Sequence, residues 1–314
     1  VDTSVAELSG ASISDKSPCP VNPSNDSRQH GTADASLLVA REYGVAPDVT
    51  LNSYQTMSSG STADSSCKDS AVIYKHASLI NHAINDGAQI ISISISSNDR
   101  NASLKWAMAR AMSSGTIIVA GIGNSASDND SGSLATWSGV VGVSAVDVNG
   151  ARADYSSWGQ GVTTAAVGGP VTYRDYSSGS NVQSYGSSSS APIVAGFLAV
   201  TMQQWDGATS NQVLQSLVRT ASSGRSGQPL ISPRNLDSTD PTQFPDENPL
   251  MDKFPGTEPS AAMVEDYRDG LLVSESVFDN DVSYVYRGAN PVVVAMRPDR
   301  SALGTSPRYH RGAD

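Results

Sequence analysis

Four consecutive serines, Ser187 to Ser190, stand between Gly186 and an apolar run that begins at Ala191. A serine repeat commonly forms a flexible, solvated linker. This tract instead leads directly into APIVAGFLAV, which predicts a buried helix. A hydroxyl group at the start of a helix can serve as a nucleophile, because free backbone N–H groups there can stabilise a developing negative charge. The tract is therefore a candidate for nucleophilic catalysis rather than a spacer.

His30 is the histidine best suited to acid–base chemistry. It is followed by a Gly-Thr pair and by ADASLLVA, a small-residue stretch that predicts a helix starting near the histidine. Small neighbours permit close packing, so we expect the imidazole to be held in position. His76 and His82 lie six residues apart on one predicted helix and face different sides, which argues against a shared metal ion. His310 lies near the C-terminal end.

The stretch TIIVAGIGNSA allows a different chemistry. A strand followed by Gly121-x-Gly123-x-x-Ala126 resembles a dinucleotide-binding fingerprint, with Asp147 as the ribose-binding acid. That fingerprint needs a helix that begins in the glycines and holds the pyrophosphate at its N-terminus. The following SASDNDSGSLATW does not predict a helix. The sequence therefore disfavours a dinucleotide site.

The elements that must position these residues alternate between apolar strands and amphipathic helices from about residue 30 to residue 220. Such alternation indicates βαβ units. We therefore predict a three-layer α/β fold, in which a mostly parallel sheet carries helices on both faces. The predicted strands are 49–57, 88–96, 116–120 and 140–146, and the predicted helices are 30–42, 70–86, 104–112, 191–204 and 212–220.

The composition of the chain changes after residue 222. Residues 223–260 are rich in Pro, Asp, Ser and Gly and show no hydrophobic periodicity. Further on, VSYVY and VVVAM flank RGANP, which predicts a small hairpin at 282–296. We expect one domain over 1–222 and an irregular C-terminal extension over 223–314.

The bulk composition favours a globular protein and argues against two kinds of partner. The chain has 314 residues, of which 38% are hydrophobic and 16% charged, and a net charge of −11. Such a charge repels phosphate backbones, so we expect no nucleic-acid partner. No apolar run reaches the length of about 18 residues needed to span a membrane, so we expect no membrane segment in this chain.

Four motifs, taken in chain order, resemble the subtilisin-like serine peptidase family. VDTSV, HGTADAS, VAGIGNS and the serine tract before APIVAG are similar to that family's D-T-G, H-G-T-x-x-A, A-x-G-N and G-T-S-x-x-x-P patterns. The resemblance covers about residues 1–220, and the ordered set is far more specific than any single motif. The loop cysteines and the segment DPTQFPDENPLMDK are most similar to mycosin-like actinobacterial members.

The resemblance implies a serine endopeptidase with a subtilisin-like sheet. The family's nucleophile precedes the helix proline by four residues, which assigns the role to Ser188 because the proline here is Pro192. We expect this proline in the first turn of the helix, where its missing N–H has no partner to lose. Asp2, His30 and Ser188 would then form the catalytic triad.

The resemblance also implies groups that bind the substrate. The side-chain amide of Asn124 and the backbone N–H of Ser188 would form the oxyanion hole. The predicted substrate-binding residues are Ser94, Ile95 and Ser96, as an edge strand that pairs with the peptide, and Gly121 and Gly123, which would line the pocket for the residue before the scissile bond.

No cofactor is required by this chemistry; structural calcium is compatible with the family, although the sequence indicates no site for it. The substrate would be a polypeptide, and a propeptide or a secretion-machinery partner would lie outside this chain. The low lysine content and the Ser/Gly-rich surface segments, together with the resemblance, suggest an extracellular or cell-envelope location.

Cys19 and Cys67 each lie in a polar loop. They can form a disulfide or remain two free thiols. Because free cysteines are usually buried, the loop setting favours the disulfide. That bridge would imply an oxidising compartment.

The sequence departs from the family pattern at several positions. Asp34 lies four residues after His30, hence on the same helix face, where the family usually has an apolar residue. A buried, unpaired carboxylate there would be costly and could perturb the histidine. Ser4, Ser36 and Ser96 replace glycines. These departures leave open a catalytically inactive subtilase-fold scaffold or binding module, for example in a secretion assembly.

The family pattern places Asp2 at the end of a buried strand, most of which would precede the first residue given. We therefore expect the chain to be a fragment, and residues 1–314 expressed alone to be unstable or inactive.

Overall fold

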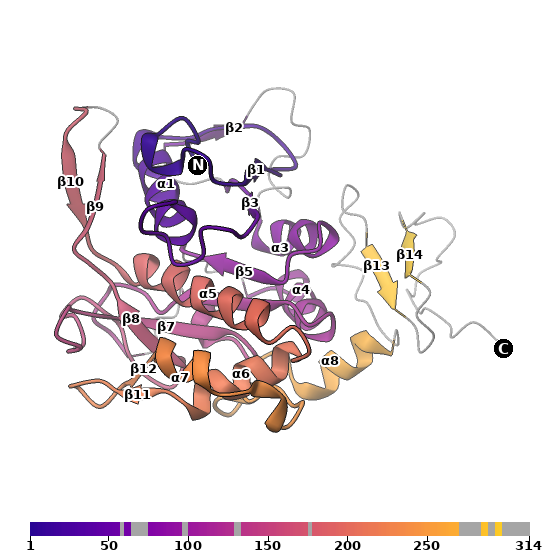
Figure 1. The fold of residues 1–314 in the computed structure, drawn as a ribbon. Coiled ribbons are helices and arrows are strands. Elements are labelled where there is room, and N and C mark those ends of the chain that lie inside the picture. Colours follow the sequence, from indigo (N-terminus) through magenta and orange to yellow (C-terminus); the bar gives the residue numbers. More distant parts are fainter. Residues whose placement is uncertain are drawn as a thin grey trace.

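A four-stranded parallel sheet lies at the centre of the fold (Figure 1). Its strands, in spatial order, are β5 (Ile90–Ile93), β6 (Ile117–Gly121), β7 (Val141–Val146) and β8 (Thr164–Val167), and each neighbouring pair is parallel. The computed structural model describes residues 1–56, 60–63, 75–95, 100–128, 133–174 and 178–269 and the strand segments 284–287 and 293–296.

Helices cover both faces of this sheet, so the predicted three-layer fold class is confirmed. Along β6, Ile117 and Val119 pack into one core cluster, whereas Ile118 and Ala120 pack into another. This alternation follows from the two-residue period of a strand and explains why its sequence is continuously apolar. The first cluster contains residues of α5 (Ser187–Gln204) and α6 (Ser210–Arg219), and the second contains residues of α3 (His76–Asn85) and α4 (Ala102–Ser113).

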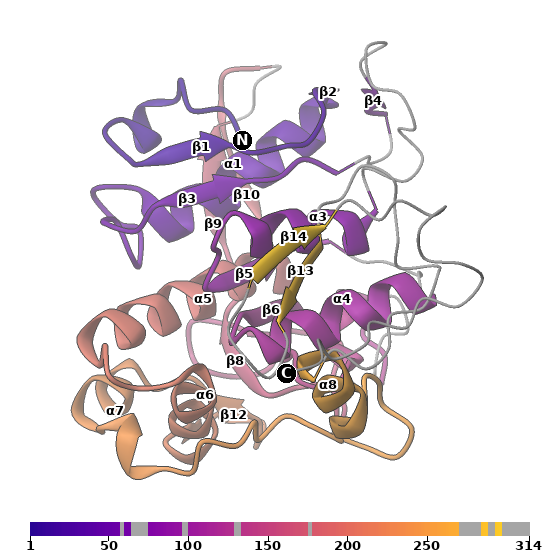
Figure 2. The same ribbon diagram turned by 90° about the vertical axis from the view of Figure 1, so that its right-hand side faces the viewer.

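A second, smaller parallel sheet lies beside α1 (Asn25–Val39) and consists of β1 (Ile13–Asp15) and β3 (Leu51–Ser53) (Figure 2). Among the described strands, β3 pairs only with β1, and β5 pairs only with β6. The parallel strands thus form two separate parts, and β3 and β5 each have one side that pairs with no described strand.

A cavity of about 970 Å³ lies between these two parts. Its walls include the whole of β3 and β5 and residues of α1, α3 and α5. Val1 also lines the cavity. The lining includes the apolar side chains Leu38, Leu51, Ile80, Ile91, Ile93 and Ala195.

The chain beyond residue 222 continues in the same core. Ile231, Leu236 and Leu250 belong to the cluster that packs between the sheet and α5. The backbone N–H of Ile231 donates to the carbonyl oxygen of Ala165 in β8, at 3.0 Å. Residues that the sequence assigns to an extension therefore help to bury one face of the central sheet.

Lys253 fixes this later segment to the loops at the end of the sheet. Its ammonium group donates to the carbonyl oxygens of Ala135, Val140 and Gly161. Burial lowers the pKa of Lys253 to about 7. The three acceptors oppose that effect, because they stabilise the charged form.

The remaining described elements are short. The helices are α7 (Pro233–Ser238) and α8 (Ala261–Arg268), and the paired strands are β2 (Val21–Asn22) with β4 (Thr62–Ala63), β9 (Val171–Arg174) with β10 (Asn181–Ser184), β11 (Ser222–Ser223) with β12 (Pro229–Leu230), and β13 (Tyr284–Arg287) with β14 (Val293–Met296). Among the helices that the structure describes, none is both long and apolar enough to cross a bilayer.

The helix that carries His30 begins earlier than predicted. It starts at Asn25, because the Ser24 hydroxyl accepts the backbone N–H of Ser27 and caps the helix. His30 therefore lies in the second turn rather than at the start of α1. The signal for this cap, Pro23-Ser24 before Asn25, is present in the sequence and indicates the earlier start.

Candidate active site

Burial separates the four serines at the start of α5. Ser187, Ser189 and Ser190 are all buried, with exposed fractions of 2%, 4% and 0%. Ser188 alone among the four is partly exposed. Of the tract, only Ser188 is therefore accessible to a substrate.

Two of the buried hydroxyls hold the start of α5 against the sheet. The Ser187 hydroxyl accepts the backbone N–H of Gly123 at 3.0 Å. The Ser190 hydroxyl donates to the carbonyl oxygen of Ala166 in β8, also at 3.0 Å. These bonds connect α5 to both β8 and the loop after β6, so the position of Ser188 is determined by its neighbours in the tract.

Asn124 lies beside Ser188 and is oriented by Ser187. Its Oδ1 accepts the backbone N–H of Ser187 at 2.8 Å, which leaves the amide nitrogen free to point elsewhere. A Cβ atom added to Gly186 would lie 2.8 Å from Ser188 Oγ, 3.1 Å from Asn124 Nδ2 and 3.6 Å from the Ser188 backbone nitrogen. These three groups therefore surround one small space, which is open because residue 186 is glycine.

Gly121 allows the close approach of α5 to the end of β6. A Cβ atom at this position would lie 2.9 Å from both the carbonyl oxygen and the hydroxyl of Ser187. Gly123 adopts a φ of +109°, which favours glycine. Both glycines thus have a structural reason to be present, and their role in lining a substrate pocket stays a prediction.

Pro192 lies deeper in α5 than predicted. The helix begins at Ser187, so the expectation of a first-turn proline is wrong. The missing N–H of Pro192 leaves the Ser188 carbonyl without its usual helix partner. The Ser94 hydroxyl replaces that partner and donates to the Ser188 carbonyl oxygen at 2.9 Å.

Of the predicted substrate strand, Ser94 and Ile95 follow directly after β5 and line the large cavity. Ser96 lies outside the described residues. The contact between Ser94 and Ser188 brings the end of β5 to the start of α5.

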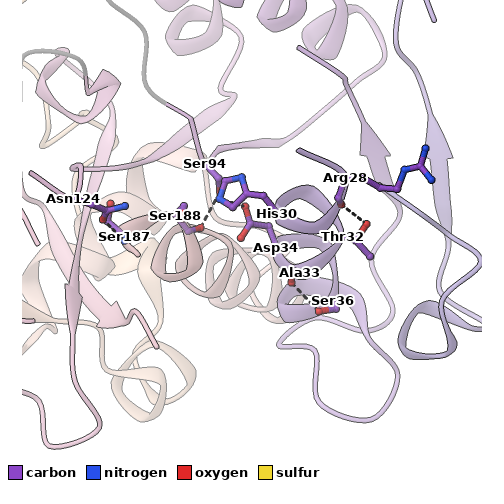
Figure 3. A network of polar contacts seen from close by, with 10 residues as sticks. All are labelled: Arg28, His30, Thr32, Ala33, Asp34, Ser36, Ser94, Asn124, Ser187 and Ser188. Carbon is purple, nitrogen blue, oxygen red and sulfur yellow. Dashed lines mark hydrogen bonds and ion pairs between the residues drawn. The ribbon is translucent and has the colours of Figure 1, made fainter. Parts of the chain in front are cut away.

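His30 projects from α1 toward the same region (Figure 3). Its side chain is 38% exposed and lines the cavity. Its Nε2 atom lies 3.5 Å from Oδ2 of Asp34, one turn further along the helix. In Figure 3, His30, Asp34, Ser94 and Ser188 gather where α1, β5 and α5 meet.

Asp34 is largely enclosed. Its side chain is 13% exposed, and its Oδ1 atom is buried without a hydrogen-bond partner. Loss of hydration raises the pKa of the carboxyl to about 6, although His30 and the Ser94 hydroxyl act in the opposite direction. The sequence identified Asp34 as a departure from the family pattern, and the structure places it in contact with His30.

Asp2 lies beside α1, and its carboxylate forms its hydrogen bonds with Ser4. Its Oδ1 accepts the backbone N–H of Ser4 at 2.9 Å and the Ser4 hydroxyl at 2.6 Å. The hydroxyl bond is the main reason that the pKa of Asp2 is lowered. The backbone N–H of Asp2 donates to Thr32 Oγ1 at 2.8 Å. Ser4 is one of the serines that stand in place of a family glycine.

Two further predictions concern metal ions and a disulfide. Within the described parts of the chain, no group of three or more His, Cys, Asp or Glu residues is arranged to hold a metal ion. Cys67 lies outside the described residues, so its pairing with Cys19 stays a prediction.

With this geometry established, comparison with known proteins identifies the family. The model of the Subtilase family matches residues 7–246. The chain therefore belongs to the subtilase family and is classed as a serine-type peptidase, a hydrolase that acts on peptide bonds.

Two relatives illustrate the extent of the match. Subtilisin DY of Bacillus licheniformis is 31% identical over 204 residues, which cover 62% of this chain and 71% of that protein. The thermostable alkaline protease of Halalkalibacterium halodurans is 31% identical over 205 residues, which cover 63% of this chain and 53% of that protein. The chain thus spans about half the length of the second relative.

Solved structures share the fold. The prenylagaramide maturation protease PagA superimposes with a TM-score of 0.61 and 22% identity, covering 76% of this chain and 89% of that one. A cold adapted subtilisin-like serine proteinase gives a TM-score of 0.58 and 22% identity, covering 73% and 84%.

Proposed function

We propose that this chain is a serine endopeptidase in which Ser188 is the nucleophile and His30 the general base. Asp2 is the carboxylate that the family pattern assigns to the imidazole. Asn124 Nδ2 and the Ser188 backbone N–H form the oxyanion hole. The substrate is a polypeptide, and the chain acts outside the cytoplasm.

In this mechanism His30 accepts the proton of the Ser188 hydroxyl as that oxygen attacks the scissile carbonyl. The resulting oxyanion enters the space bordered by Gly186, where two N–H donors stabilise it. His30 then returns the proton to the leaving amine, and water hydrolyses the acyl enzyme by the same steps. Ser94 to Ser96 bind the extended substrate backbone.

One observation carries the proposal. Around the position of a Cβ on Gly186, Ser188 Oγ, Asn124 Nδ2 and the Ser188 backbone nitrogen lie at 2.8, 3.1 and 3.6 Å. A nucleophile and two donors around one open space are two of the parts that acyl transfer needs, and His30, the proposed base, lines the neighbouring cavity. The burial of Ser187, Ser189 and Ser190 supports Ser188 as the reactive member of the tract.

The test is covalent labelling of the chain with a fluorophosphonate, followed by peptide mapping and by a peptide hydrolysis assay. We expect the label on Ser188, and we expect Ser188→Ala to abolish both labelling and hydrolysis. Ser189→Ala is the matched control, because Ser189 is the next residue on the same helix and is buried; this variant should retain both. Labelling of Ser188→Ala, or no labelling of the folded parent chain, would refute the proposal.

A further inference from the structure

The contact between Asp34 and His30 has no place in the triad mechanism. The imidazole reaches Asp34 through Nε2, at 3.5 Å from the carboxylate Oδ2. In the triad, one imidazole nitrogen donates to the orienting carboxylate and the other accepts the serine proton. With Asp2 as the orienting carboxylate, a second carboxylate occupies the side of the ring on which the serine must act.

The surroundings leave Asp34 with few other ways to offset its charge. Its Oδ1 atom is buried without a partner. The Ser94 hydroxyl also interacts with the carboxylate, but its single hydrogen is shared with the Ser188 carbonyl. An N–H from the imidazole is therefore the donor best placed to stabilise an ionised Asp34.

We propose that Asp34 is a positioning residue that competes with Ser188 for His30 Nε2 and so restrains this site. The proposal rests on the proposed function. When Asp34 is ionised, it stabilises the imidazolium form and holds the Nε2–H. A protonated imidazole cannot accept the Ser188 proton. Removal of the Asp34 charge then releases His30 to act as a base at lower pH.

The competition between Asp34 and Ser188 takes place in a small region, because Ser94 contacts both residues. Ser94 lies near the Asp34 carboxylate and also bonds the carbonyl of Ser188. The Ser94 hydroxyl therefore lies between Asp34, which restrains the base, and Ser188, which is the nucleophile. Asp34, His30, Ser94 and Ser188 therefore form one polar cluster (Figure 3).

Other ionisable groups near the cluster come from three parts of the chain. The N-terminal segment supplies Asp2, and α1 supplies Arg28, which interacts with it. The residue after β5 and the start of α5 supply the uncharged hydroxyls Ser94 and Ser188. His76, at the start of α3, and Asp86, directly after that helix, also line the cavity. All of these remain in an Asp34 variant, so a change can be assigned to Asp34.

The primary experiment measures the rate of fluorophosphonate labelling of Ser188 against pH in the full chain, with and without Asp34→Asn. Because a carboxylate beside the imidazole favours its protonated form, removal of that charge should extend labelling to lower pH. We expect the acid limb of the profile to move to lower pH by about 1 pH unit in Asp34→Asn. Asp34→Val, which suits an enclosed position, should shift it in the same direction. Asp26→Asn is the control, because Asp26 lies four residues before His30 on the same helix and is exposed.

Labelling below the parent plateau should then be about tenfold faster in both Asp34 variants. The second readout is the ¹⁵N NMR signal of His30 Nε2, which should move in both Asp34 variants and stay in place in Asp26→Asn. An unmoved acid limb in both Asp34 variants, or slower labelling at every pH, would overturn the proposal. Labelling absent from all variants, with a moved Nε2 signal, would instead refute the proposed peptidase mechanism and leave the contact of Asp34 with Nε2 established.

Discussion

The two sides of the candidate site are built in different ways. On the nucleophile side, which comprises Asn124 and Gly186 to Ser188, neutral hydrogen bonds connect α5 to the loop after β6 and to β8 of the continuous four-stranded sheet. On the base side, which comprises Asp2, His30 and Asp34, ionisable groups lie on α1 and the N-terminal segment beside a cavity of about 970 Å³.

This difference separates two kinds of sensitivity. Short, buried hydrogen bonds require closely fitted groups. A substitution that adds even a small side-chain volume should therefore disturb the nucleophile side most. The energy of an ionisable group beside a cavity depends on its hydration and on its protonation state. Changes of pH and of packing should therefore affect the base side most. The following experiments test that contrast, beginning with the largest expected effect.

Gly186→Ala should abolish most hydrolysis while the fold remains intact. The new methyl group would lie 2.8 Å from Ser188 Oγ and 3.1 Å from Asn124 Nδ2, in the space needed by the oxyanion. Blocking that space should cost at least the roughly 100-fold loss seen when one oxyanion donor is removed. The measurements are kcat for a peptide substrate and the thermal unfolding temperature. Retention of full activity would show that the oxyanion does not bind beside Gly186.

An apolar strand placed between β3 and β5 should stabilise the base side. Both strands present unpaired edges to the cavity, and Val1 lines it. A fusion of six β-branched residues before Val1 could pair with both edges and bury two or three side chains, each worth about 1.5–3 kcal/mol.

We expect this fusion to raise the thermal unfolding temperature and the rate of peptide hydrolysis. A Gly/Ser extension of equal length is the control, since it adds chain without apolar side chains. Equal unfolding temperatures for the two extensions would show that the cavity does not accept a strand.

Asp34→Asn should stabilise the protein in a pH-dependent way. The carboxyl has a pKa of about 6 in the folded chain against a reference value of 3.8. The folded state therefore retains the proton more strongly than the unfolded state, and the stability that this provides is present below pH 4 and lost as the pH rises through 6.

At pH 7 the variant should consequently gain about 3 kcal/mol in the free energy of unfolding, and at pH 3.5 almost nothing. Urea denaturation at both pH values measures the difference, with Asp26→Asn as the exposed control. A gain of equal size at both pH values would indicate better packing rather than relief of a buried charge.

Much of the nucleophile side follows from short-range sequence. The distance from Ser188 to Pro192, the glycine before the tract and the apolar run after it lie within a few residues of one another. The structure agrees in that Ser188 is the accessible serine. The helix start was predicted less well, because the tract itself enters the helix and Pro192 lies beyond its first turn.

The base side was harder to predict. The sequence showed that Asp34 shares a helix face with His30, and the i, i+4 spacing accounts for their contact. It did not show that Ser4 would bond the Asp2 carboxylate or that Ser94 would bond the Ser188 carbonyl. The first depends on the conformation of a turn, and the second joins residues 94 positions apart.

The sequence by itself determined the family, the three-layer arrangement of helices and strands, and the residue types available for acyl transfer. These depend on local patterns: the period of apolar residues and the order of short motifs. Tertiary structure alone decided how deeply each serine is buried, which glycine keeps a space open, and how far the Asp34 carboxyl is removed from water. Those properties arise when segments distant in the chain pack together and exclude water, because burial changes both the room around a group and the energy of its charge.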